Sequence, residues 1–277
     1  MSDALTPELM LEVLKRSGYL LESRIISMLN EMGVFVEPNA SYFDKKTGVS
    51  REIDALVELH RFNQDRVGTQ VCVKTSFVLE AVNNPSPVLV MTPYKWAPLT
   101  NEMDYIPYCY SPGHDENDGH PFDYQGVMPE LKLPVGETLF CQYCGFSRKK
   151  QHDRDWMASH PDDLYGSIKK AVEYALTLRD ESEKWMANPS DAYWRIFKWR
   201  PVIVIGGELY QMKDQKIESV TQAKLRFNLH WEGDESSVIV DFVSEKALPA
   251  FIEVTQSEDD EIEKKLIRLK KSEMGEP

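Results

Sequence analysis

Apolar side chains recur at helical spacing near the start of the chain and predict two consecutive helices. The first begins at Thr6, an N-capping residue type, and Pro7 after it suits the first turn of a helix. Gly18 interrupts the pattern, and a second helix is expected to end at Gly33, which supplies a C-cap. One face of this second helix is predicted to be buried, because its apolar residues lie at helical spacing. They are Leu20, Leu21, Ile25, Met28 and Leu29.

The next part of the sequence alternates between apolar and polar positions and predicts strands. Residues 34–60 are expected to form a hairpin whose turn lies at 44–48. A third strand is predicted over 68–77 and a fourth over 87–93, which is apolar on both faces as a buried strand should be. A short helical turn over 77–82 is expected between them. The order of helix, three strands, short helix and strand predicts an α/β fold with a mixed sheet.

The second half of the chain adds a long helix and several antiparallel strands. The helix is predicted to begin near Asp162 and Asp163. A buried strand follows, with a hairpin turn at Gly206 and Gly207, and two alternating strands surround Gly233. Another helix is expected from about Ser244.

The absence of an internal repeat or a clear linker predicts a single domain over 1–277. Its expected parts are a core over 18–93, an irregular insertion over 94–154, an outer helix and strands over 155–260, and a charged tail over 261–277.

Composition restricts the cellular compartment and the kinds of partner that we expect for such a domain. The sequence has no apolar run of about 18 residues, which excludes a membrane-spanning helix, and it begins with no signal-peptide pattern. Four cysteines in 277 residues are not a disulfide framework, so we expect a cytoplasmic protein. The formal net charge of −13 argues against a general coat for nucleic acid, because phosphate binding depends on Lys and Arg. This net charge is compatible with an acidic, metal-binding cleft that has basic residues around its rim.

Two charged residues stand inside the predicted strands. Asp54 stands in the middle of an apolar run in one strand, and Lys74 lies in the next strand. If these strands pair in a suitable register, the two side chains point into the same space. Carboxylates bind hard divalent cations, and a nearby lysine can orient a water molecule or offset developing charge. Solvent exposure of a strand face that also carries Glu52 and Glu58 is the ordinary alternative.

The array "GYLLESRIISMLNEMGVFVEPNASYFDKKTGVSREIDALVELH…VCVKTSF…PVLV" resembles the restriction-endonuclease-like superfamily, also called PD-(D/E)XK nucleases, over residues 18–93. The resemblance implies a restriction-endonuclease-like α/β core. It also implies that Glu22 supports the site from the first helix, that Asp54 binds metal, and that Lys74 is the lysine of the E-x-K element. Mg²⁺ or Mn²⁺ would be the cofactor, and DNA the substrate.

Cys72 departs from this family pattern, because it stands where the family has a glutamate. A thiol is a poor ligand for Mg²⁺. Glu80, predicted to lie in the short helix, is the first choice for a relocated carboxylate, with Glu58 or Glu52 as alternatives. The other outcome is a degenerate site in a fold that survives as a binding or scaffold module.

A second motif, Cys141-Gln-Tyr-Cys144, resembles a zinc knuckle but supplies two of the four ligands that zinc needs. Further ligands from the same region would be Cys109, His114, His120 and His152. A pair of cysteines without a bound metal is the alternative. The basic and aromatic stretch 146–156 is a candidate phosphate contact, with a solvated loop as the alternative. The Gly206–Gly207 pair lacks nucleotide-binding spacing.

The sequence therefore favours a divergent, divalent-metal-dependent nuclease acting on DNA, in restriction, repair or defence. Its predicted site residues are Asp54, Lys74, Glu80 and Glu22, with Asp54 and Glu80 as metal ligands. The competing hypothesis is a catalytically inactive nuclease-fold protein that binds nucleic acid or a protein partner.

Overall fold

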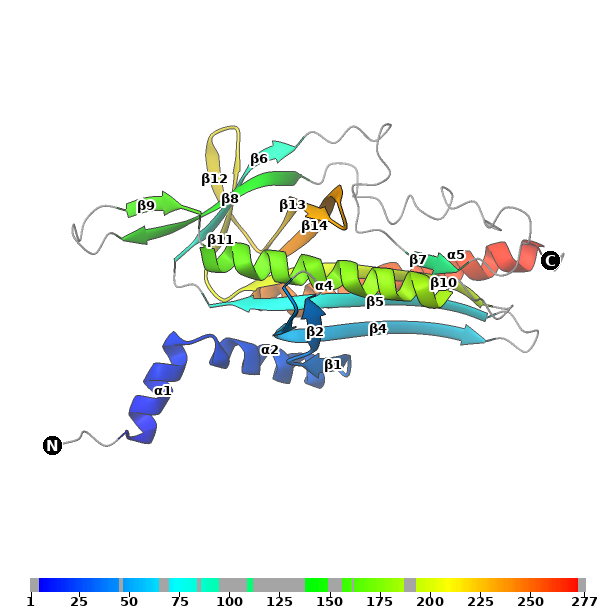
Figure 1. Ribbon diagram of the computed structural model, residues 1–277, viewed down its shortest axis with the longest axis horizontal. Coiled ribbons are helices and arrows are strands. Elements are labelled where there is room, and N and C mark those ends of the chain that lie inside the picture. The colour runs from blue at the N-terminus through cyan, green and yellow to red at the C-terminus, as the bar shows by residue number, and fades with distance from the viewer. Residues whose placement is uncertain are drawn as a thin grey trace.

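A mixed twelve-stranded sheet runs through the described part of the protein, and helices lie against both of its faces (Figure 1). This computed structural model describes residues 5–44, 47–64, 70–83, 86–94, 109–111, 138–148, 156–160, 162–186 and 193–273. The strand order is β1 (Phe35–Pro38), β4 (Ala55–Gln64), β5 (Gln70–Val82), β10 (Tyr193–Ile205), β14 (Asp234–Ser244), β13 (Gln222–Trp231), β8 (Leu139–Arg148), β6 (Val88–Tyr94), β11 (Leu209–Lys213) and β12 (Lys216–Val220). β7 (Cys109–Ser111) pairs with β10, and β9 (Trp156–Ser159) pairs with β8.

The helices and one separate hairpin complete the described structure. They are α1 (Pro7–Arg16), α2 (Tyr19–Glu31), α4 (Asp162–Met186), the 3-10 helix η3 (Glu245–Ala247), α5 (Leu248–Glu273), and the hairpin of β2 (Ser41–Asp44) and β3 (Val49–Glu52). Thr6 caps α1 by accepting a hydrogen bond from the Leu9 backbone N–H at 3.2 Å. α1 projects away from the sheet and contacts α2 (Figure 1).

The central strands combine both pairing directions. β4 runs antiparallel to β5, β10 runs parallel to β5 over its whole length, and β14 runs parallel to β10. A parallel pair needs a crossover connection, and the chain between β5 and β10 includes α4 for this purpose. Val202 to Ile205 are all fully buried, as expected for a strand that is covered on both faces.

The side chains of β5 alternate between the two faces of the sheet and show which helices pack on each face. Phe77 and Leu79 pack with α2 and α5, whereas Val78 faces the opposite side and packs in the cluster that includes α4. α2 buries the stripe Leu21, Ile25 and Leu29, as its four-residue spacing predicted. Figure 1 shows α4 lying along β5 and β10 on one face.

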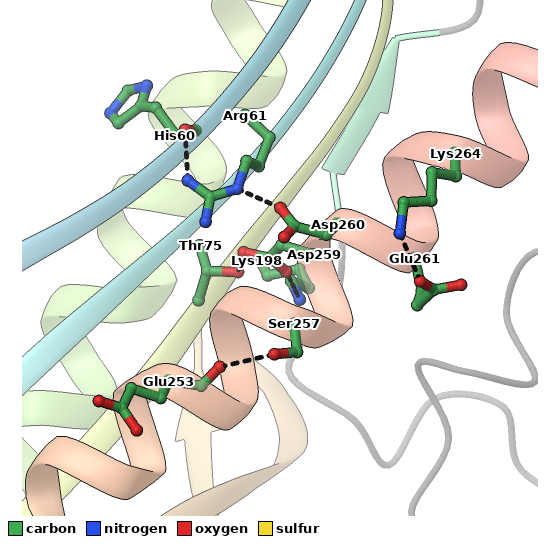
Figure 2. Close-up of polar contacts among 10 residues, drawn as sticks. All are labelled: His60, Arg61, Thr75, Lys198, Glu253, Ser257, Asp259, Asp260, Glu261 and Lys264. Atoms are coloured by element: carbon green, nitrogen blue, oxygen red, sulfur yellow. Dashed lines mark hydrogen bonds and ion pairs between the residues drawn. The ribbon is translucent and has the colours of Figure 1, made fainter.

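A buried polar cluster fastens α5 to its face of the sheet (Figure 2). Lys198 of β10 forms an ion pair with Asp259 of α5, and the Thr75 hydroxyl donates to the Asp259 carboxylate at 2.8 Å. All three residues are at least 97% buried. Nearby, Arg61 of β4 pairs with Asp260. These contacts fix the axial position of α5, because a buried charge left without its partner is costly.

Several sequence predictions are confirmed by these elements. The chain is α/β with a large mixed sheet, the interruption at Gly18 separates α1 from α2, and a helix follows Ser244. Gly48 lies in the β2–β3 turn with φ 69°. The β13–β14 hairpin turns at Glu232 and Gly233, both with positive φ.

Other predictions were wrong in instructive ways. The helical turn expected over 77–82 is the end of β5, because its side chains alternate between two buried faces. Gly206 and Gly207 do not join a hairpin: both edges of β10 are already paired, so β11 instead pairs with β6 and β12. The region expected to be an irregular insertion contains β8, which joins β6 to β13. The charged tail, by contrast, is the amphipathic helix that its sequence predicts: it continues α5 and buries Ile262 and Leu266.

No helix within the described ranges is long and apolar enough to cross a membrane.

Candidate active site

The register of β4 and β5 brings Asp54 next to Glu80. Ala55 is opposite Leu79 in this antiparallel pair, so the preceding residue Asp54 lies beside Glu80 where β5 approaches its end. The Asp54 carboxylate accepts a hydrogen bond from the Ala81 backbone N–H at 2.7 Å. This bond extends the contact between the two segments beyond Ala55, through the side chain of Asp54. It also fixes the orientation of the Asp54 carboxylate.

The two carboxylates share the face of the sheet that α4 covers. Leu56 and Val78, which are two residues from Asp54 and Glu80 along their strands, pack in the core on that face. Lys170 of α4 reaches toward the sheet and places its Nζ 2.7 Å from Glu80 Oε1. Glu80 is 2% exposed, so this ion pair lies where water has little access.

Glu22 completes the acidic group from the first turn of α2. It is half-buried, and its carboxyl interacts electrostatically with Asp54 and Lys170. The structure thus brings three of the predicted site residues together, Glu22, Asp54 and Glu80, and adds Lys170, which the sequence analysis did not identify.

Proton affinities in this group reflect burial and mutual repulsion. Burial and the negative charge of Asp54 raise the pKa of Glu80 to about 7, although Lys170 acts in the opposite direction. Burial also raises the pKa of Asp54, against the hydrogen bond from Ala81 and the charge of Lys170. The pKa of Glu22 is raised by burial and by Asp54. Perturbed acids of this kind cluster at functional sites.

Contacts at the end of β5 hold the start of α2 in place beside these acids. The Asn83 side-chain amide donates to the Ser17 carbonyl at 2.6 Å, at the junction of α1 and α2. The Gly206 N–H donates to the Val82 carbonyl at 3.1 Å. A Cβ atom on Gly206 would lie 2.9 Å from Leu21 Cδ2, so the close approach of this loop to α2 depends on glycine.

The structure places Lys74 elsewhere on the same strand. It is opposite His60 and forms an ion pair with Glu58, six residues before Glu80. At about 3.3 Å per residue this separation is about 20 Å along the strand. The expectation that Asp54 and Lys74 converge is therefore not met, because it assumed a register that differs from the one observed.

Cys72 lies still farther from the acidic group and is opposite Phe62. It does not occupy the strand position next to Asp54, where the structure has Glu80. Of the alternative acids, Glu58 is engaged with Lys74 and His60, and Glu52 is exposed in β3.

The cysteine motif lies on a strand and not on a knuckle. Cys141 and Cys144 are three residues apart in β8, so their side chains face opposite sides of the sheet. One zinc ion cannot bind both thiols in this arrangement. His114, His120 and His152 lie outside the described residues, as does most of the basic stretch 146–156.

Within the described ranges, no three His, Cys, Asp or Glu side chains lie close enough together to hold a metal ion as they stand. No family model, curated protein or solved structure matches the chain.

Lys170 was missed because its role depends on tertiary structure. An amphipathic helix with adjacent Lys169 and Lys170 gives no local sign of which lysine turns inward. Lys169 is half-exposed and lies 3.9 Å from Glu173, whereas Lys170 is mostly buried against the sheet.

Proposed function

We propose that this protein is a divalent-metal-dependent nuclease that hydrolyses phosphodiester bonds in DNA. The observation that carries the proposal is the position of Asp54, directly before β4, beside Glu80 of the adjacent antiparallel strand β5, with the Lys170 ammonium group 2.7 Å from Glu80. Two carboxylates and a lysine in a partly desolvated position are the chemical parts that such a reaction needs.

The order of elements around these residues supports a restriction-endonuclease-like core. α2 precedes β4, β4 is antiparallel to β5, and α4 leads to β10, which is parallel to β5. Glu22 lies on α2, Asp54 directly before β4, and Glu80 on β5, where the sequence had predicted a short helix. The departure is the lysine, which comes from α4 and not from β5.

The acidic group fits a hard divalent cation better than it fits other cofactors. Asp54 and Glu80 offer oxygen ligands, and Mg²⁺ commonly binds to one or two carboxylates while water and substrate phosphate fill its other positions. Burial and the charge of Asp54 raise the pKa of Glu80 to about 7 despite Lys170, so a bound cation would favour the ionised form of this carboxylate. When bound, the cation would supply an activated water molecule and offset charge on the phosphate.

The side chains have separate roles in this proposal. Asp54, oriented by the Ala81 N–H, and Glu80 would hold the cation. Lys170 would turn from Glu80 toward the substrate, where it can orient the attacking water or stabilise the developing negative charge. Glu22 would hold a further water molecule in position from α2.

The test is DNA cleavage by the purified protein with Mg²⁺ or Mn²⁺, on single-stranded and double-stranded substrates. Asp54→Asn and Glu80→Gln keep the size of each side chain and should abolish metal-dependent cleavage. Glu58→Gln is the matched control, because Glu58 lies on the same face of β4 as Asp54 but pairs with Lys74. Absence of cleavage and of metal binding in the wild-type protein would refute the proposal and favour a non-catalytic module that binds nucleic acid or a protein.

A further inference from the structure

A partly enclosed cavity lies on the α4 face, and none of its lining residues belongs to the acidic group described above. It is a cavity of about 180 Å³ between the β2–β3 hairpin, α4, and the turn that joins β13 to β14. Its lining combines aromatic rings with carboxylates and contains no basic residue among the described ones: Tyr42, Phe43, Asp44, Glu173, Thr177, Asp180, Trp231 and Glu232.

The most informative group in this cavity is the Tyr42 hydroxyl. Tyr42 is 7% exposed, and its hydroxyl has no hydrogen-bond partner among the residues that the structure describes. A buried polar group is normally paired, since leaving it unpaired costs free energy. The charges of Glu173 and Asp44, which both line the cavity, act on this hydroxyl, and so do those of Arg51 and Glu80.

The aromatic rings are held rigidly around the cavity. Tyr42 stacks on Tyr174, with ring centroids 4.8 Å apart and planes inclined by 20°. The Trp231 indole N–H donates to the Asp180 carboxylate at 2.8 Å, which fixes the orientation of the indole ring. Ring faces attract cations through their quadrupole, and cages of aromatic rings recognise ammonium groups in this way.

Four acidic residues line the cavity, and basic residues outside the lining pair with three of them. Arg51 pairs with Asp44 at 2.8 Å, and Arg179 pairs with Asp180 at 2.6 Å. Glu173 is 7% exposed and lies 3.9 Å from Lys169, whose own side chain is half-exposed. The turn residue Glu232 adds another acid to the lining. Because the described lining contains acids and no basic residue, an anionic ligand is disfavoured.

We propose that this cavity binds a small organic cation of the alkylammonium or guanidinium class. Its hydrocarbon or planar part contacts Tyr42 and Trp231, and its N–H groups donate to Glu173 and to the Tyr42 hydroxyl oxygen. The cavity volume suits one such head group, which would supply the hydrogen-bond partner that Tyr42 lacks. The inference does not depend on the proposed nuclease activity.

The test is isothermal titration calorimetry of the full chain with butylammonium, methylguanidinium and putrescine. Potassium serves as a charge control, and butanol as an apolar control. We expect at least one organic cation to bind, with affinity that falls as salt is raised, and neither control to bind. Preference among the three probes distinguishes an amine from a guanidine or a diamine. No binding by any of them, or equal competition by potassium, overturns the proposal.

Variants separate a binding role from a structural one. Glu173→Gln should weaken binding about tenfold, the effect of losing one charged partner. The matched control Glu181→Gln makes the same change of charge on an exposed part of α4 outside the lining and should leave affinity unchanged. Equal weakening by both variants would mean that general charge, and not this cavity, attracts the ligand.

Tyr42→Phe gives the sharpest readout. Because Phe keeps the ring stack and removes the unpaired hydroxyl, the variant should melt at a higher temperature than the wild type without ligand. It should nevertheless bind the cation several-fold more weakly and gain less from it in melting temperature. A variant that loses stability and keeps wild-type affinity contradicts the proposal. Binding seen only after Lys45→Ala and Lys46→Ala would also overturn it, since the occupant would then be the chain's own lysine.

Discussion

Lys170 and Glu80 form an ion pair that joins α4 to β5, with 2.7 Å between Lys170 Nζ and Glu80 Oε1. Ninety residues separate them in the sequence, and the pair exists because the β5–α4–β10 crossover lays α4 along the sheet. On the same sheet face, Lys74 forms a different ion pair with Glu58. These two lysines offer a direct comparison of candidate catalytic positions.

If Lys170 is the lysine of a metal-dependent nuclease, Lys170→Met should lower the rate constant for DNA cleavage by about 10²-fold or more, the usual effect of removing a proton-transfer or charge-stabilising group. Lys74→Met should change it less than about threefold, because Lys74 does not reach the acidic group. Single-turnover cleavage with Mn²⁺ measures both constants. If Lys74→Met lowered the rate constant more than Lys170→Met, the catalytic lysine would be Lys74 of β5 and not Lys170.

The raised pKa of Glu80 predicts how stability depends on pH in metal-free protein. The folded state keeps the Glu80 proton up to about pH 7, whereas the unfolded chain releases it near the ordinary value of 4.5. The stabilisation is therefore complete below pH 4.5 and is lost as pH rises through about 7, and it amounts to on the order of 3 kcal/mol. The raised pKa values of Asp54 and Glu22 act with the same sign.

Glu80→Gln isolates this effect, since a neutral amide resembles the protonated acid. Urea unfolding in the presence of EDTA at pH 5 and pH 8 should show that the variant gains free energy of unfolding relative to wild type at the higher pH. An equal difference between the two proteins at both pH values would mean that Glu80 titrates normally.

Two glycines near the site should respond to alanine in opposite directions. In Gly206→Ala the new Cβ would lie 2.9 Å from buried Leu21, so we expect a loss of about 1–3 kcal/mol in the free energy of unfolding. Displacement of Leu21 also shifts the adjacent Glu22, and cleavage should slow. Gly166 lies exposed in α4 with nothing near its Cβ position, so Gly166→Ala should stabilise the protein by about 0.5–1 kcal/mol. Chemical denaturation of both variants measures these changes, and a loss in both would contradict the packing argument.

The sequence could predict the parts of the fold that depend on local periodicity. The buried stripe of α2 and the alternation around Asp54 follow from spacings of about four and two residues. The end of β5 was misassigned because "FVLEAV" is apolar on both sides of Glu80, a pattern that short helices share with buried strands.

The site itself was only partly predictable, because its geometry depends on register and on long-range packing. Glu80 was named as a carboxylate that could join Asp54, but from a helix and not from the strand that the structure shows. The choice of Lys74 assumed a pairing about six residues away from the observed one. Lys170 requires knowledge of which face of α4 meets the sheet, and that face is decided by contacts with distant strands.

The buried ion pair of Lys198 and Asp259 provides a stability test on the opposite face of the sheet (Figure 2). Burial lowers the pKa of Lys198, while Asp259 opposes this change, so the pair is held in a position where neither charge is well solvated. Asp259→Asn should cost about 3–5 kcal/mol in the free energy of unfolding, since it leaves the ammonium group without its charged partner. Lys198→Met together with Asp259→Leu should cost less than the single change, because it removes both desolvated charges.

The exposed pair of Lys264 and Glu261 on the same helix is the control, and Glu261→Gln should change stability by no more than about 0.5 kcal/mol. Equal costs for the buried and exposed changes, measured by urea denaturation at pH 7, would mean that the Lys198–Asp259 pair does not fasten α5 to the sheet.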